Sequence, residues 1–263
     1  AEMIEPYKGI IYDPACGSGG MFVQSIKFIE NHHGNKKEIS IYGQEYTNTT
    51  YKLAKMNLAI RGISGNLGEK AADTFGDDQH KDLKADYIMA NPPFNVDGVN
   101  TDQIKQQVGQ WNEEAETAGT PQTPEAGKRL PFGLPGTNAK TKAISNANSL
   151  WVQYFYAYLN ATGRAGFVMA SSASDAGNKD KDIRRRLVST GHVDTMVAIG
   201  PKFFYTRSLP CTLWFFDKAK PQQAVGNACN SQDRVLMLDA RNVYHVESAR
   251  HHRFTDEHLA TLT

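Results

Sequence analysis

Residues 9–20 read GIIYDPACGSGG, a short apolar run followed by an acidic residue and a glycine-rich turn. When an amphipathic helix follows such a turn, the pattern is typical of the first strand, loop and helix of an open α/β sheet. We expect this strand at residues 10–12 and the helix from Gly20 onward. Ligands of such sheets bind at this turn, because glycines let the backbone approach closely and the helix start has free N–H groups. The apolar face of the helix is predicted to carry Met21, Phe22, Ile26 and Ile29.

Apolar runs and helical periodicities alternate along the rest of the chain, which predicts a sheet covered by helices. The fold class that we expect is α/β, with a mixed seven-stranded sheet and helices on both faces. Further strands are predicted at residues 39–43, 67–72, 86–90, 166–170, 193–199 and 210–216. Further helices are predicted at residues 47–60, 148–159 and 180–189. The helix at residues 47–60 is predicted to have a mixed apolar face of Leu53, Ala54, Met56, Asn57 and Ile60.

One α/β domain is expected over residues 1–218, interrupted by a long loop at residues 95–148. The loop is rich in Gly, Pro, Thr and Gln, and a loop of that length in a compact domain is usually functional or disordered. Residues 219–263 are expected to form a linker, an extra strand at residues 235–238 without an assignable partner, and the start of a C-terminal extension. Because the chain opens directly on the first strand, we expect a fragment of a longer protein.

The composition is that of an ordinary globular protein, with 40% hydrophobic and 22% charged residues. No apolar run approaches the roughly 20 residues that span a bilayer, and the N-terminus lacks a signal-peptide pattern. We therefore expect a cytoplasmic protein without membrane contact. The three cysteines are an odd number without paired spacing, which disfavours a disulfide framework and a zinc site, so we predict no metal.

The formal net charge of the chain is only +1, whereas a free-standing DNA-binding protein is expected to have a globally basic surface. Basic residues are clustered instead, and such clusters are either solvated faces or phosphate contacts. If DNA binds, other subunits are expected to supply much of the affinity. The clusters are Lys179, Lys181, Arg184, Arg185 and Arg186 in one stretch, and Lys128, Arg129, Lys140 and Lys142 in another.

Acidic residues accompany the glycine-rich turn in the predicted fold. Glu45 follows the second strand, where a carboxylate can accept both ribose hydroxyls of a nucleoside. Asp13 would repel a pyrophosphate, yet it suits a ligand that carries a sulfonium and an ammonium group. These residues favour S-adenosylmethionine as the cofactor, with Asp73 either accepting the amine of its adenine or serving as a plain loop residue. The turn lacks the G-x-G-x-x-G pattern of dinucleotide sites, which makes a nicotinamide-dependent dehydrogenase the weaker alternative.

Residues 91–94 read Asn-Pro-Pro-Phe directly after the predicted strand at residues 86–90, and this is the most specific string in the chain. Two prolines fix the backbone and remove two N–H donors, so the carbonyls of Asn91 and Pro92 are held as acceptors in a rigid corner. An adenine N6 amine presents two N–H donors, which the Asn91 side-chain oxygen and the Pro92 carbonyl can accept. Phe94 can stack on the base. The alternative is a structural turn with a buried aromatic ring.

These two strings resemble the cofactor motif and the catalytic motif of N6-adenine and related amino-methyltransferases. Residues 43–45, 50–58, 209–215 and 253–257 also look like the corresponding stretches of type I restriction-modification modification subunits. The resemblance covers essentially the whole chain and implies a Rossmann-like S-adenosylmethionine-dependent methyltransferase fold. It implies cofactor contacts at Asp13, Ala15, Gly17, Ser18, Gly19, Glu45 and Asp73, and catalytic contacts with the target base at Asn91, Pro92 and Phe94. Tyr46 stands where the family often has Asn, so that position is left unassigned.

The same resemblance implies an activity and partners. We expect an adenine-specific DNA methyltransferase that acts on double-stranded DNA with a flipped adenine. Its expected partners are a specificity subunit, which reads the DNA target, a second modification subunit and a restriction subunit. The loop at residues 95–148 is expected to order on DNA or on a neighbouring subunit. Methylation of protein glutamine or of RNA, and a non-catalytic assembly scaffold, stay open as alternatives.

Overall fold

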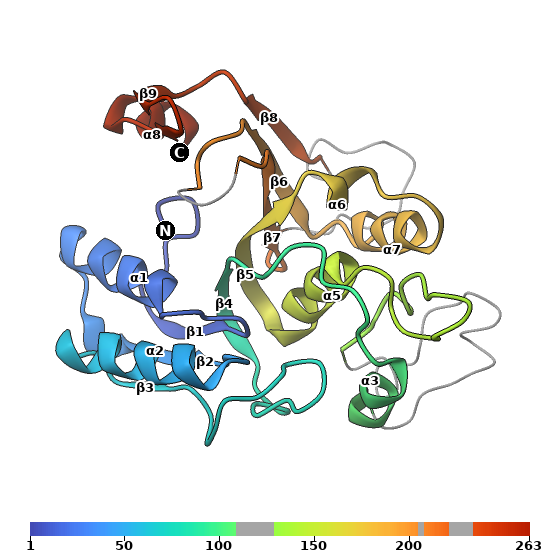
Figure 1. The fold of residues 1–263 in the computed structure, drawn as a ribbon. Helices are drawn as coiled ribbons and strands as arrows, with labels where there is room; N and C mark the ends of the chain where they lie inside the picture. The colour runs from blue at the N-terminus through green and yellow to red at the C-terminus, as the bar shows by residue number, and fades with distance from the viewer. Residues whose placement is uncertain (109–128, 205–207, 221–233) are drawn as a thin grey trace.

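A computed structural model describes residues 1–108, 129–204, 208–220 and 234–263 (Figure 1). The middle of the expected long loop and most of the expected linker therefore lie outside the described residues. Within the described ranges, no helix is long and apolar enough to cross a membrane.

The described part of the chain is built on a mostly parallel eight-stranded sheet with the order β3-β2-β1-β4-β5-β7-β6-β8. Only β7 runs antiparallel to its neighbours within this sheet. The expected α/β class with a mixed sheet is confirmed. The strands are β1 (Gly9–Asp13), β2 (Ile39–Gly43), β3 (Gly65–Asn66), β4 (Ala85–Ala90), β5 (Leu159–Ala170), β6 (Val193–Ile199), β7 (Cys211–Asp217) and β8 (Leu236–Ala240).

Two strand predictions need correction. The main sheet has eight strands and not the expected seven. The eighth is β8, the extra strand that was predicted without an assignable partner, which pairs in parallel with β6. The third strand was expected at residues 67–72 but lies at β3, because Gly68 adopts a φ of 81° that ends an extended run. Leu67 is buried in the core on one face of the sheet. Its apolar side chain belongs to this core and not to a strand, which explains why the strand was predicted at the wrong residues.

Helices cover both faces of the sheet (Figure 1). α1 (Gly20–Asn31) and α2 (Asn48–Ile60) pack on one face, whereas α5 (Asn148–Tyr158) and α7 (Asn178–Val188) pack on the other. Consecutive β1 residues supply the two cores, Ile11 to the first and Tyr12 to the second, as strand alternation requires. The remaining elements are a 3-10 turn (Lys36–Glu38), α3 (Thr101–Val108), α6 (Ser172–Asp175), α8 (Asp256–Leu262) and a separate hairpin of β9 (His245–Ser248) and β10 (His251–Arg253).

The buried face of α2 differs from the predicted one. Leu53, Met56 and Ile60 are exposed by 51%, 59% and 77%, so this part of the expected stripe faces outward. The buried set is Tyr51, Ala54 and Leu58, which has the same helical spacing. Periodicity alone cannot choose between two stripes of equal spacing. Contacts from distant residues select the second, since the Tyr51 hydroxyl donates to the Gly68 carbonyl at 2.8 Å.

The described parts of the long loop at residues 95–148 are packed against the core. α3 lies within the loop, and the backbone N–H of Ile144 donates to the Val99 carbonyl at 2.9 Å. This region was predicted as an irregular loop, but its scattered apolar residues anchor it to the domain. The buried anchors are Ile104, Leu130, Phe132, Leu134 and Ile144.

Arg129 is part of this anchoring, contrary to both roles considered for its basic cluster, because it lies neither on a solvated face nor at a phosphate site. Its side chain is 2% exposed, and its Nε and Nη2 atoms donate to Asp78 Oδ2 at 3.1 and 3.0 Å. Nη2 also donates to the Lys81 carbonyl at 2.7 Å, and the guanidinium lies over the Tyr158 ring. The ion pair therefore fastens the loop to the segment that follows β3.

Arg129→Ala should lower the free energy of unfolding by about 3–5 kcal/mol, because it breaks the buried ion pair with the Asp78 carboxylate. Urea denaturation of the purified protein measures this change. Arg185→Ala is the matched control, since Arg185 makes an exposed ion pair with Asp182 and its removal should cost less than about 1 kcal/mol. Equal denaturation midpoints for the two variants would contradict the structural role of Arg129.

Candidate active site

The parallel strands bring three loops together at one edge of the sheet. β1 pairs with β2 so that Asp13 lies opposite Gly43, and β1 pairs with β4 through Tyr12 and Ile88. The chain proceeds from β1 outward to β2 and β3, and then crosses to β4 on the other side of β1. This reversal of strand order opens a crevice at the carboxyl ends, which is where open α/β sheets bind ligands.

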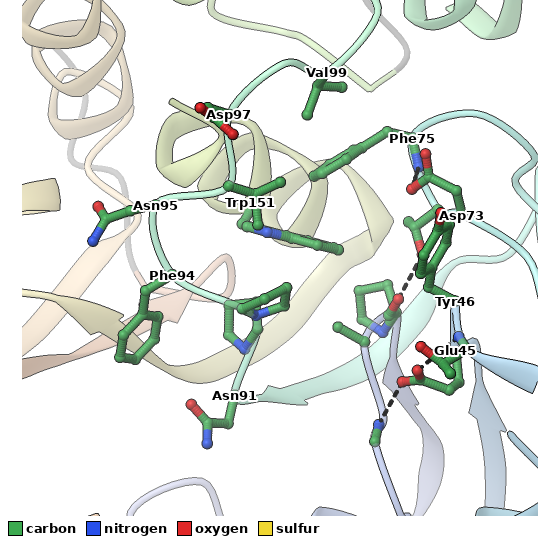
Figure 2. A pocket seen from close by; sticks show the side chains of 18 of the residues that line it. Glu45, Tyr46, Asp73, Phe75, Asn91, Phe94, Asn95, Asp97, Val99 and Trp151 are labelled. Carbon is green, nitrogen blue, oxygen red and sulfur yellow. Dashed lines mark hydrogen bonds between the residues drawn. The ribbon is translucent and has the colours of Figure 1, made fainter. Parts of the chain in front are cut away.

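A pocket of about 1190 Å³ occupies this crevice. Small-molecule sites usually measure roughly 300–1,000 Å³, so the space suits more than one ligand group. Figure 2 shows Asn91 and Phe94 on one side, Glu45, Tyr46 and Asp73 on the other, and Trp151 between them. The described lining residues include no Lys, Arg or His, whereas Glu45, Asp73 and Asp97 give the pocket an acidic character.

The Glu45 carboxylate is held in place by the backbone on both of its oxygens. Its Oε2 accepts from the Gly17 N–H at 3.1 Å, and its Oε1 accepts from the Thr47 N–H at 2.9 Å. Each oxygen keeps a second acceptor site, so the fixed carboxylate can still bind two hydroxyl donors. Gly17 has a φ of 54°, and no atom lies within 4 Å of the position that a Cβ would take there. The turn therefore leaves open space beside Glu45.

Asp13 lies behind this turn rather than in the pocket lining. It is 1% exposed, and its Oδ1 accepts from the Ala15 N–H at 3.0 Å. Burial raises the pKa of Asp13 against the lowering effect of the Ala15 hydrogen bond, and with a smaller contribution from the Glu45 carboxylate the pKa reaches about 7. A cation placed near a buried carboxyl group stabilises its ionised form.

Gln44 shapes the loop that carries Asp73. This fully buried side chain donates through Nε2 to the carbonyls of Ala72 and Asp77, at 3.1 and 2.9 Å. Its Oε1 accepts from the Gln79 N–H at 3.0 Å. Asp73 is thereby kept at the pocket, where its Oδ1 accepts from the Phe75 N–H at 3.1 Å and burial raises its pKa. The sequence offered no signal for this role beyond the position of Gln44 at a strand end.

The Asn91–Pro92–Pro93–Phe94 elbow leaves β4 directly into the pocket. Pro92 is buried, Asn91 is exposed and Phe94 is half-buried. The Phe94 ring meets Phe204 edge to face, with ring centroids 6.0 Å apart. The rings of Phe94 and Phe204 thus line the side of the pocket that the elbow forms.

The structure brings most of the predicted site residues together. Asp13, Ser18 and Gly19 do not line the pocket; Ser18 is exposed, and Gly19 is the buried residue that directly precedes α1. The predicted residues in the lining are Ala15, Gly17, Glu45, Asp73, Asn91, Pro92 and Phe94. Lining residues to which the sequence analysis assigned no role in the site include Tyr46, Gln103, Trp151, Phe204 and Leu209. The last four come from segments distant in sequence, so no local motif could have identified them.

The architecture and the pocket together define a methyltransferase-type α/β domain with a ligand site at the carboxyl edge of its sheet. The family model described as N-6 DNA Methylase matches residues 1–132 and 133–263, and the chain therefore belongs to this family. The resemblance to type I modification subunits is confirmed. The chain is 36% identical over 261 residues to the type I restriction enzyme MjaIX methylase subunit of Methanocaldococcus jannaschii, covering 99% of this chain and 41% of that protein.

A second relative supports the family, and a solved structure supports the fold. The type I restriction enzyme HindI methylase subunit of Haemophilus influenzae is 36% identical over 262 residues, covering 99% of this chain and 51% of that protein. Among solved structures, the methyltransferase subunit of a type I restriction-modification system from Streptococcus thermophilus superposes with a TM-score of 0.70 at 21% identity, covering 96% of this chain and 46% of that one. The chain thus spans about half the length of the relatives that it matches.

Gln44→Ala should lower the free energy of unfolding by about 3 kcal/mol, because three backbone groups lose their partner and each uncompensated group costs roughly 1–3 kcal/mol. Urea denaturation measures the loss. Gln24→Ala, at an exposed site on α1, is the matched control and should change stability by less than about 0.5 kcal/mol. If both variants unfolded alike, Gln44 would not shape the Asp73 loop.

Proposed function

We propose that this chain is the catalytic core of a DNA methyltransferase that transfers a methyl group from S-adenosylmethionine to adenine N6. The observation that carries the proposal is the shared pocket, in which the Asn91–Phe94 elbow faces Glu45 and Asp73. Membership of the N-6 DNA methylase family supports the same reaction.

The residues on the Glu45 side fit S-adenosylmethionine. Glu45 would hold the ribose hydroxyls, Asp73 the amine of the adenine ring, and Ala15 and Gly17 the open turn beside them. The buried Asp13 carboxyl favours a ligand that carries positive charge. The lining has no cationic side chain among the described residues, so it offers no side-chain charge to neutralise the pyrophosphate of a dinucleotide. When bound, S-adenosylmethionine supplies an electrophilic methyl group.

The elbow side fits the base. The Asn91 side-chain oxygen and the Pro92 carbonyl accept the two N6 hydrogens of a flipped adenine, while Phe94 stacks on its ring. These contacts position N6 for in-line attack, and positioning supplies much of the rate. N6 would bond to the methyl carbon as the bond between that carbon and the sulfonium sulfur breaks, so the cofactor would leave as S-adenosylhomocysteine. The N6 proton becomes acidic only after the new bond forms and would then pass to water, so no general base is required before attack.

In the cell, the parent protein would act as the modification subunit of a type I restriction-modification system. The relatives are named as methylase subunits of type I restriction enzymes, which supports this assignment. Its partners would be double-stranded DNA, a specificity subunit that reads the target, a second modification subunit and a restriction subunit. We also propose that the catalytic domain proper covers residues 1–218 and that the C-terminal extension adds β8 as an edge strand to its sheet.

Asn91→Ala in the full-length protein, assembled with its specificity subunit, should lower the methyl-transfer rate by roughly 100- to 1000-fold. The loss of one positioned acceptor removes an interaction that strengthens as N6 becomes nucleophilic. Transfer of tritiated methyl groups to DNA measures the rate, and calorimetric titration with S-adenosylmethionine should give an unchanged Kd.

Asn31→Ala provides the control, because Asn31 ends α1 at the opposite edge of the sheet and should leave the rate unchanged. Normal turnover by the Asn91→Ala variant would refute the role of the elbow. Label transferred to protein or RNA in place of DNA would identify another substrate class. A full-length protein that fails to bind S-adenosylmethionine would identify a scaffold.

Cofactor affinity should rise with pH through about 7. Asp13 has its pKa raised to about 7, so its carboxyl is largely neutral below that pH and largely ionised above it. The ionised form attracts a cationic ligand, and affinity should fall by up to about tenfold per pH unit below the pKa. Calorimetric titration between about pH 6 and about pH 8 measures this slope. Asp13→Asn should bind more weakly at the upper pH and lose the slope; a slope that persists in this variant would assign it to another group.

A further inference from the structure

The residue that follows the elbow has an unusual backbone conformation. Asn95 adopts a φ of 55°, in the left-handed region that few residues other than glycine occupy. Asn enters this region more readily than most residues because its short amide can form local hydrogen bonds. The elbow itself has limited means of anchorage, since two of its four residues are prolines without an N–H group. The direction in which the chain leaves the elbow is therefore set at Asn95.

A reciprocal pair of hydrogen bonds holds Asn95 to Asn148. The Asn95 N–H donates to Asn148 Oδ1 at 2.9 Å, and Asn148 Nδ2 donates to Asn95 Oδ1, also at 2.9 Å. Asn146 Nδ2 and Ser172 Oγ donate to the same Asn95 oxygen, at 3.1 and 3.3 Å. One side chain thus fixes both the backbone and the side chain of the residue next to Phe94.

Asn148 is itself rigidly placed. It is the first residue of α5 and is 5% exposed. The neighbouring Ala147 N–H donates to the Val96 carbonyl at 2.8 Å, so two consecutive residues at the start of α5 hold two consecutive residues after the elbow. α5 also carries Trp151, which lines the same pocket. The position of the elbow is therefore fixed relative to α5, a buried helix that forms part of the pocket wall.

We propose that Asn148 is a positioning residue, which holds the Asn91–Phe94 elbow in the geometry that methyl transfer requires by clamping Asn95. The inference rests on the proposed function and assigns a role to a residue outside the catalytic motif. Asn148 acts on the target side of the pocket, so its loss should affect kcat and base placement more than cofactor binding.

The clamp needs an amide side chain at position 148, because one atom must accept and the other must donate. Aspartate has nearly the same shape, but it would place a carboxylate oxygen against Asn95 Oδ1 with no hydrogen between them. Alanine would remove both bonds. Both substitutions should therefore release the elbow, although only one of them changes the volume of the side chain.

The test compares Asn148→Ala and Asn148→Asp with Gln153→Ala in the full-length protein assembled with its specificity subunit. Gln153 is a matched control, because it is also a buried amide on α5 that accepts one bond and donates another. Its partners are the Phe132 N–H and the Gly133 carbonyl, both at 2.9 Å, which lie away from the elbow. All three variants are first compared with the parent by thermal unfolding.

Both Asn148 variants should lower kcat by about 100-fold, the effect of a misplacement of roughly 1 Å, with the Kd for S-adenosylmethionine unchanged. Gln153→Ala should lower the Tm by a similar amount and keep kcat. DNA with 2-aminopurine at the target position should show altered fluorescence only with the Asn148 variants, because the flipped base is stacked differently. Equal losses of kcat in the Asn148 and Gln153 variants would reduce Asn148 to a structural residue and overturn the proposal.

A double-mutant cycle with Asn95→Ala isolates the clamp itself. If Asn148 acts through Asn95, the double variant should lose no more activity than the more impaired single variant. Independent, multiplicative losses would overturn the proposal.

Amide hydrogen exchange separates this inference from the proposed reaction, because it requires no turnover. The Asn95 N–H should exchange about fivefold faster or more in Asn148→Ala than in the parent or in Gln153→Ala. An unchanged exchange rate contradicts the clamp, whatever the protein methylates. Faster exchange in Asn148→Ala, together with a parent protein that transfers no methyl group to DNA, would keep the clamp and refute the proposed function.

Discussion

The parallel pairing of β1 with β2 and β4 is the constraint on which the site depends. Because the pairing is parallel, the loops after all three strands emerge at one edge, and the register sets them side by side. Two backbone bonds carry the register into the loops: the Gln44 N–H donates to the Asp13 carbonyl at 3.0 Å, and the Cys16 N–H donates to the Gln44 carbonyl at 2.9 Å. A shift by one residue would move Glu45 away from the glycine turn.

Under the proposed function, the charge of the pocket explains how a chain of net charge +1 can act on a nucleic-acid substrate. The acidic lining suits a cationic cofactor and a neutral base, but it disfavours phosphate groups. Under the proposed function, the base must therefore leave the duplex and enter alone, while the DNA backbone stays outside. Phosphate contacts then fall to other surfaces and to partner subunits, which removes the need for a globally basic domain.

Local patterns in the sequence located the parts of the site that are contiguous in the chain. The strands at residues 39–43 and 193–199 and the loops after β1 and β4 lie where they were predicted, because alternation, glycines and prolines act within a few residues. The failures involve distant partners. Gly68 ends β3 early, the Tyr51 contact selects the buried face of α2, and Arg129 leaves its basic cluster to pair with Asp78. Each outcome depends on a residue that the local pattern did not contain.

α5 shows why the rest of the pocket was beyond such patterns. Every residue of this helix except Tyr156 is buried, so it has no polar face that would reveal its orientation. Buried polar side chains are stabilised by hydrogen-bond partners, and on α5 the two amides and the serine each reach a different segment. Asn148 bonds to the residue after the elbow, Ser149 to Asp180 of α7, and Gln153 to the backbone of residues 132–133. The helix is therefore the common frame to which the elbow and the long loop are attached, and its few polar residues report where those attachments lie.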